Sequence, residues 1–187
     1  MKFTKLTVDG TYIIDLEKRG DERGSLTRIW CEKEFAENGI FATLRQGYSS
    51  TTKHKGTIRG IHCQVAPAAE DKLTRVVKGK IFEVIVDLRK DSPTFMKWEG
   101  VTLSAEDDKM MFIPSGVAHG FLTLTDDVVF ENMSSQPFTP EYEKGIRYND
   151  PAFNISWPIP VKHASQKDTS WQDYQPEGKA HIQEVPR

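Results

Sequence analysis

The fold is decided by Lys80-Ile81-Phe82-Glu83-Val84-Ile85-Val86-Asp87-Leu88, a stretch whose side chains alternate as those of a β-strand do. One face of this strand carries Ile81, Glu83, Ile85 and Asp87. The other face carries Phe82, Val84, Val86 and Leu88. If the first face lined a barrel, Glu83 and Asp87 would need buried partners, because an unpaired buried charge is costly. We therefore expect that face to point to water.

Three further stretches are similarly rich in apolar and β-branched residues. They cover residues 73–77, 110–113 and 121–125. Glycine, proline and aspartate turn signals separate them, and short strands at this spacing indicate a β-sandwich or barrel. A helix is expected at residues 32–38, because Asn38-Gly39 suits a helix C-terminus. From about Trp157 we expect an irregular segment that wraps over the barrel, with a frayed tail from about residue 175.

The length and charge of the chain limit its function class. Its 187 residues predict a single domain, 1–187, and a net charge of −2 argues against a general nucleic-acid binder, which is usually basic. No apolar run is long enough to span a bilayer, and residues 1–5 do not begin a signal peptide, so we expect a cytoplasmic protein with no membrane partner. Cys31 and Cys63 lie far apart, and we expect both to be reduced and unpaired.

The residues with most chemical potential cluster at positions 56–64 and around His119. Arg59 and His62 are an odd number of positions apart and would project to opposite faces of a strand, but a bend at Gly60 would bring both into one pocket. His119 lies in a predicted turn that leads into a strand. A histidine there can be a base, a ligand or a satisfied turn residue, and taken alone the last is expected.

The spacing of these residues argues against a metal site. Metal-binding double-stranded β-helix proteins usually carry two histidines separated by one residue, a carboxylate a few positions on and a third histidine on a later strand. Here Gln64 stands where the second histidine would be, and Glu70 and Asp71 follow on a predicted loop. We expect no metal, which leaves His62 as a proton-transfer group.

An ordered series of motifs resembles the dTDP-4-dehydrorhamnose 3,5-epimerase family. The series runs over nearly the whole chain, from about residue 3 to 175. It comprises residues 21–24 (DERG), 56–62 (GTIRGIH), 72–79 (KLTRVVKG), 86–89 (VDLR), 92–95 (SPTF), 97–98 (KW), 103–106 (LSAE), 113–114 (IP), 118–121 (AHGF), 149–151 (NDP), 157–158 (WP) and 167–168 (KD).

The resemblance implies an all-β jelly-roll barrel of the cupin type, a double-stranded β-helix with a few short helices. It also implies a homodimer without cofactor or metal. The activity it implies is epimerisation of a 4-keto-6-deoxy sugar on a nucleotide diphosphate. C3, C5 or both would be inverted by proton abstraction next to the C4 ketone, in deoxysugar and polysaccharide biosynthesis such as that of lipopolysaccharide O-antigen.

The resemblance also assigns roles to individual residues. His62 matches the base, Asp168 the carboxylate that orients and polarises it, and Lys72 the cation that stabilises the enolate. Substrate contacts are implied for Arg59, His119 and Arg23, the last reaching the diphosphate, often from the neighbouring subunit. Taken singly, several of these could be solvated surface residues, but their joint occurrence at the family spacing favours the functional interpretation.

The sequence departs from the family on the side of the acid. The family places a tyrosine, its acid, where this chain has Asn132, and a second aromatic near the substrate is Phe138. An asparagine cannot donate a proton as an acid can. A one-residue slip would bring Glu131 to the site, where a carboxylic acid with a raised pKa could take over the role.

Two further departures fall in the predicted nucleotide pocket. The family's Gln-x-Asn reads Gln46-Gly47-Tyr48, so that Gln46 is kept and Tyr48 is expected to stack on a base or sugar or to cover the rim. A family glutamate after the DxRG motif is Arg28. Two other functions stay open beside the epimerase: a family member that binds a sugar nucleotide without catalysis, and a keto-sugar isomerase on the same barrel.

Overall fold

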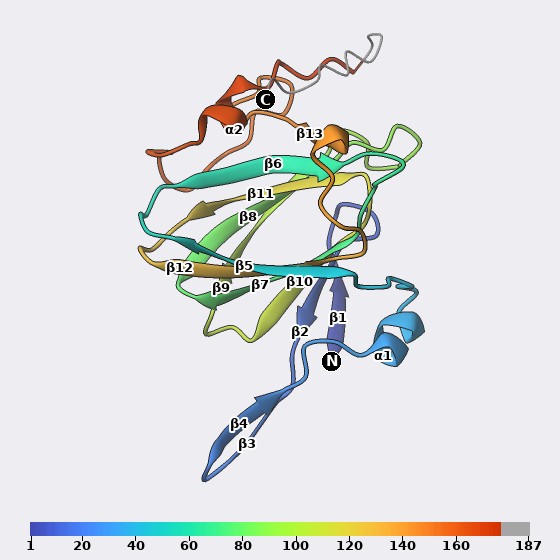
Figure 1. Cartoon of the computed structure of the whole chain (residues 1–187), viewed down its shortest axis with the longest axis vertical. Helices are drawn as coiled ribbons and strands as arrows, with labels where there is room; N and C mark the ends of the chain where they lie inside the picture. Colours follow the sequence, from blue (N-terminus) through green and yellow to red (C-terminus); the bar gives the residue numbers. More distant parts are fainter. Residues whose placement is uncertain (177–187) are drawn as a thin grey trace.

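Two antiparallel sheets face each other and make up most of the regular structure (Figure 1) in residues 1–176, which the computed structural model describes. The strands of the larger sheet, in spatial order, are β1 (Lys2–Lys5), β2 (Tyr12–Asp15), β10 (Lys109–Ile113), β7 (Lys72–Lys78), β12 (Val128–Ser134) and β5 (Gln46–Thr52). Those of the smaller sheet are β13 (Glu143–Gly145), β6 (Ile58–Gln64), β11 (Val117–Thr123), β8 (Lys80–Asp87) and β9 (Trp98–Ser104). The order of the strands, with crossovers between the sheets, confirms the expected all-β barrel.

Each sheet has apolar side chains packed on both of its faces. Between the sheets the core includes Ile81, Ile85, Met111, Phe121 and Phe130. The outer face of the six-stranded sheet packs on α1 (Glu32–Glu37), whose Phe35 lies against Met110 and Phe112. The outer face of the five-stranded sheet is covered by the chain after β13, through Phe153, Trp157 and Tyr174. The burial of apolar surface in three layers explains why β8 is apolar on both sides.

The expectation that Glu83 and Asp87 face water is wrong. Both side chains are fully buried, because their face of β8 points into the space between the sheets. The Asp87 carboxylate accepts hydrogen bonds from Nε and Nη2 of Arg89, each at 2.8 Å. It also accepts one from the Thr94 hydroxyl at 2.6 Å. Although burial opposes ionisation, these hydrogen bonds lower the pKa of Asp87 to about 2. Glu83 belongs to the site described below.

A two-stranded hairpin extends away from the barrel (Figure 1). It is formed by β3 (Lys18–Asp21) and β4 (Gly24–Thr27), which among the strands of residues 1–176 pair only with each other. Its side chains are almost all exposed, and Leu26 is 75% accessible. Since the hairpin buries little of its own surface, it contributes little to the core formed by residues 1–176.

The helices and the C-terminal segment follow the sequence expectations closely. The predicted helix at residues 32–38 is α1, and the segment after Trp157 wraps over the barrel as expected. Two short elements were not foreseen: the 3-10 helix η1 (Pro140–Tyr142) and α2 (Gln166–Ser170). The frayed tail predicted from about residue 175 lies almost entirely outside the described residues. In residues 1–176, no helix is long and apolar enough to cross a membrane.

Candidate active site

A cavity with two lobes opens between the sheets, and both lobes are lined by His62 and Tyr48. The first lobe has a volume of about 400 Å³ and the second about 480 Å³, a size typical of small-molecule sites. The first is also lined by Gln46, Gln64, Glu70, Lys72, Asn132, Ser134, Phe138 and Glu143. The second is also lined by Ser50, Arg59, His119, Phe130, His163, Ser165, Lys167 and Asp168.

A close approach of β6 and β11 sets the position of His62. Gly60 has a φ of +93°, and a Cβ at this position would lie 2.7 Å from the carbonyl oxygen of His119. Opposite it, a Cβ on Gly120 would lie 2.7 Å from the carbonyl oxygen of Arg59. The register of the two strands shifts here. The shift is the expected bend at Gly60, and it brings Arg59 and His62 to the same lobe although they are an odd number of positions apart.

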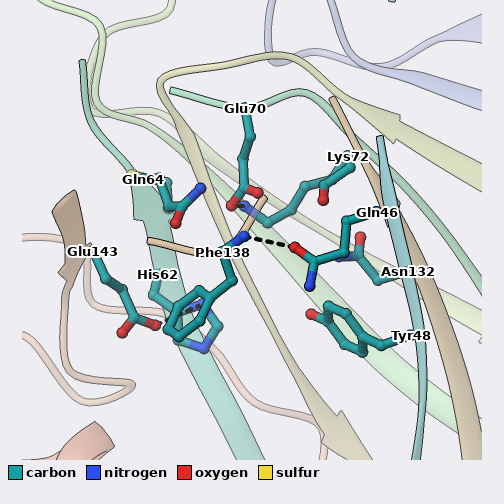
Figure 2. A pocket seen from close by; sticks show the side chains of 11 residues that line it. Gln46, Tyr48, His62, Gln64, Glu70, Lys72, Asn132, Phe138 and Glu143 are labelled. Carbon is teal, nitrogen blue, oxygen red and sulfur yellow. Dashed lines mark hydrogen bonds and ion pairs between the residues drawn. The ribbon is translucent and has the colours of Figure 1, made fainter. Parts of the chain in front are cut away.

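His62 is held as a neutral imidazole. Burial lowers its pKa from 6.5 to about 3, and the nearby His119 and Lys72 act in the same direction. Its Nδ1 lies 3.8 Å from a carboxylate oxygen of Glu143, which also pairs with Lys167. Figure 2 shows Glu143 beside the imidazole. A neutral imidazole that opens into a cavity can accept a proton at pH 7.

Asp168 lies in the same lobe as His62 but is not paired with it in residues 1–176. Ser165 caps α2 by accepting a hydrogen bond from the Asp168 backbone N–H at 3.0 Å, which fixes this carboxylate near the barrel. The side chain is 6% exposed, and burial raises its pKa. The carboxylate that contacts the His62 ring is Glu143, which the sequence reasoning missed because no motif marks it.

His119 lies beneath the second lobe in a buried polar cluster. The expectation that it lies in a turn is wrong, because the turn closes earlier, where Val117 N–H donates to the Pro114 carbonyl, and β11 begins at Val117. Its Nδ1 lies 2.9 Å from Glu83, which also accepts a hydrogen bond from Thr74 at 3.1 Å. Burial raises the pKa of Glu83 to about 8 and lowers that of His119, so burial favours the neutral form of each partner.

The first lobe contains a buried cation. Lys72, on β7, is 4% exposed and pairs with Glu70, which is also buried (Figure 2). No group of three His, Cys, Asp or Glu side chains in residues 1–176 is arranged to hold a metal ion. Lys72 offers its ammonium charge to an anion that develops in this lobe.

The rim of the first lobe is held by two glutamines. Gln46 accepts a hydrogen bond from the Phe138 backbone N–H at 2.6 Å (Figure 2). Gln64 donates to the Pro137 carbonyl at 3.2 Å and accepts from the Thr139 backbone N–H. These bonds position the Phe138 ring, which is about half exposed and lies 5.8 Å from the Lys167 ammonium.

The structure brings Asn132 into the cavity and leaves Glu131 out of it. Side chains alternate along β12, so that Phe130, Asn132 and Ser134 point inward. Glu131 points to the outer face of the sheet, where it accepts a hydrogen bond from Arg75 at 2.7 Å. The predicted slip that would bring Glu131 to the site does not occur, since it would turn the buried Val128 and Phe130 outward.

The predicted arginines lie in different places. Arg59 lines the second lobe and donates to the Thr52 hydroxyl at 2.8 Å. Arg23 lies at the turn of the projecting hairpin, is 84% exposed and pairs with Asp21. Arg28 pairs with Glu34 of α1 at 2.8 Å. The cavity of this chain is therefore lined by Arg59 but by neither Arg23 nor Arg28.

Comparison with known proteins identifies the family. The model of the dTDP-4-dehydrorhamnose 3,5-epimerase family matches residues 5–175. The chain belongs to this family. A relative named dTDP-4-dehydrorhamnose 3,5-epimerase from Methanothermobacter thermautotrophicus is 40% identical over 173 residues, covering 91% of this chain and 92% of the relative.

Two further relatives of this epimerase family bear on the site. The crystal structure of the Bacillus anthracis dTDP-4-dehydrorhamnose 3,5-epimerase with TDP and pyrophosphate bound is similar at a TM-score of 0.88 and 34% identity, covering 91% of this chain and 98% of that one. A Streptomyces niveus protein named dTDP-4-dehydrorhamnose 3-epimerase is 32% identical over 169 residues, covering 90% of this chain and 81% of the relative. The family thus includes enzymes named for two inversions and for one.

Proposed function

We propose that this chain epimerises a nucleotide-diphosphate 4-keto-6-deoxy sugar, with His62 as the base that removes a proton next to the C4 ketone. The observation that carries the proposal is a neutral imidazole between two lobes, with Lys72 in one and Arg59 in the other. A proton next to a ketone is weakly acidic. Its removal needs a base within reach and positive charge or donors at the carbonyl oxygen, where negative charge develops.

Each side chain has a role in this step. His62 takes the proton from C3 or C5, and the electrons of the broken C–H bond form an enolate whose charge lies on the C4 oxygen. Lys72 is the cation that faces this oxygen, and Arg59 adds a second donor. Two carboxylates stabilise the imidazolium that forms. Glu143 lies 3.8 Å from the His62 ring, and Asp168 lines the second lobe together with His62.

The nucleotide end of the substrate fits the rim of the first lobe. The Phe138 ring offers a face on which a base can stack, and Gln46 and Gln64 hold it in place. Lys167, close to that ring, offers a charge for the diphosphate. Which base is bound depends on these groups together with Tyr48.

We further propose a homodimer in which the β3–β4 hairpin of each copy reaches the cavity of the other. The hairpin extends beyond its own barrel and carries an exposed Arg23 and Leu26. At the tip of the hairpin Arg23 pairs only with the neighbouring Asp21 in residues 1–176, and from a partner it can bind the diphosphate. Light scattering after gel filtration tests this assembly, and a monomeric mass at micromolar concentration contradicts it.

The activity is tested by incubation in heavy water. The wild-type protein is mixed with dTDP-4-dehydro-6-deoxyglucose and with matching sugars on other nucleotides, and deuterium at C3 and C5 is followed by NMR. We expect uptake at one or both carbons, with inversion at the same carbons. Absence of uptake with every sugar would contradict the proposal. Binding without uptake identifies a sugar-nucleotide binder, and movement of the ketone to C3 identifies an isomerase.

A further inference from the structure

Inversion needs a second group, on the face of the sugar opposite His62, that returns a proton to carbon. Most ionisable groups of the cavity are committed elsewhere. Glu70 pairs with Lys72, and Glu143 pairs with Lys167, so that both carboxyl groups are engaged by a cation. Asp168 is on the same side as His62, since its α2 helix packs on β6. None of these three carboxyl groups is a free acid on the opposite wall.

Tyr48 is the tyrosine of residues 1–176 that lines both lobes. It belongs to β5 in the six-stranded sheet, whereas His62 belongs to β6 in the five-stranded sheet. Figure 2 shows the Tyr48 hydroxyl directed into the cavity from one wall, with the imidazole of His62 on the other. A sugar ring held between them has the imidazole on one face and the phenol on the other.

We propose that Tyr48 is the acid that protonates the enolate and so completes the inversion. This assignment rests on the function proposed above. After His62 has taken the proton, the Tyr48 O–H bond breaks as a new C–H bond forms on the opposite face, and the enolate electrons return to the C4 carbonyl. The tyrosinate regains a proton from water, and the imidazolium of His62 releases one to water.

Asn132 supports this role from the neighbouring strand. It is directly opposite Tyr48 in the pairing of β12 with β5, with its side chain 2% exposed. Its Oδ1 is buried without a hydrogen-bond partner in residues 1–176, which leaves it available to the phenol or to a sugar hydroxyl. Directly opposed side chains lie about 5 Å apart at Cβ, so the small amide leaves space for the phenol ring.

The protonation state of the phenol suits a donor. Burial raises the pKa of Tyr48 from its ordinary value, and the Asn132 side chain partly offsets this effect. The phenol therefore carries its proton at neutral pH. Because Tyr48 remains 45% exposed, water can return the proton after each turnover.

The test separates proton removal from proton return. Tyr48→Phe is compared with the wild type and with Tyr12→Phe, a control whose ring packs on the far side of the six-stranded sheet. With dTDP-4-dehydro-6-deoxyglucose in heavy water, Tyr48→Phe should keep deuterium uptake within about threefold. Its rate of inversion should fall by about 100-fold or more, the usual contribution of a general acid.

Each result has one meaning. If Tyr48→Phe inverted the sugar at the wild-type rate, the assignment of Tyr48 as the acid would be overturned, while the proposed epimerase activity would stand. A rise in KM with equal losses of exchange and inversion would also overturn it, because Tyr48 would then only bind substrate. Absence of exchange in the wild type would instead overturn the proposed function.

A reciprocal exchange provides the second variant. Tyr48→Asn should lose inversion, and Tyr48→Asn combined with Asn132→Tyr should recover at least about tenfold of it. The phenol then enters the same space from β12 instead of β5. The double variant could fold and take up deuterium normally without recovering inversion. That result would contradict a role that depends on a phenol at this wall.

Discussion

The two walls of the cavity differ in their proton chemistry: one carries a proton acceptor and the other a proton donor. On the wall from the five-stranded sheet, burial lowers the pKa of His62 to about 3. On the wall from the six-stranded sheet, burial raises the pKa of Tyr48. Burial favours the neutral form of both groups. A neutral imidazole can accept a proton, whereas a neutral phenol can donate one. One cavity can therefore hold a base and an acid that are both ready at the same pH.

Removal of the proton acceptor His62 should have the largest effect on activity. We expect His62→Asn to reduce both deuterium uptake and inversion by about 1,000-fold, because no proton is removed in the first place. This differs from Tyr48→Phe, which should separate the two rates. Steady-state NMR assays measure both. The exposed His54 provides the matched control as His54→Asn, and equal activity of the two histidine variants would exclude His62 as the base.

Removal of the cation on the opposite wall should have the next largest effect. We expect Lys72→Met to lower kcat by about 100-fold, since one preorganised charge at the enolate oxygen is lost. It also leaves Glu70 buried without its partner, which should reduce stability.

The double variant Lys72→Met with Glu70→Gln removes the orphaned carboxylate and should recover stability but not kcat. Thermal unfolding and turnover, measured on the same samples, distinguish the two effects. Recovery of turnover along with stability would show that Lys72 serves only the packing of the wall.

The neutral imidazole should be visible in the stability of the protein. As pH falls below 6.5, the unfolded chain takes up a proton at His62, but the folded chain does not do so until the pH approaches 3. The free energy of unfolding therefore falls with falling pH in this window, by at most about 1.4 kcal/mol per pH unit for one group.

In His62→Asn this contribution is absent, and the free energy of unfolding should fall less steeply between about pH 6 and pH 4. Urea titrations at several pH values give both slopes. Parallel slopes for wild type and variant would mean that His62 protonates as readily in the folded protein as in the unfolded chain.

The smallest effect is expected outside the cavity. Glu131 neighbours Asn132 in sequence but pairs with Arg75 on the outer face. Glu131→Gln should leave exchange and inversion within about twofold of wild type and change stability by less than about 1 kcal/mol, as expected for a partly exposed ion pair. Loss of inversion in this variant would mean that β12 turns its other face to the substrate.

The strands and the base wall could be predicted because they depend on local pattern. Alternation in residues 80–88 defines the two faces of β8, and the glycine in the run from Arg59 to His62 marks the bend. Alternation does not say which face is inside, and the prediction failed for Glu83 and Asp87 for this reason. Both faces of β8 are covered, one by the opposite sheet and one by the chain after β13.

The second wall could not be predicted because it depends on pairing between distant segments. Tyr48 and Asn132 are opposed only through the register of β5 with β12, which the sequence does not reveal. The proximity of Glu143 to His62 likewise depends on the pairing of β13 with β6. The sequence suggested a substrate contact for Tyr48, but which wall it occupies became clear only from the fold.

The covering of the outer sheet by the chain after β13 has a consequence for synthesis. A nascent chain that has reached Gly145 contains every strand of residues 1–176, yet it lacks Lys167 and Asp168, which line the second lobe. Since domains begin to fold from the N-terminal side as they leave the ribosome, the barrel can form before this lobe is complete. With the roles proposed for Lys167 and Asp168, the site is complete only after the segment that follows β13 has docked, so the barrel is made before the groups that complete its chemistry.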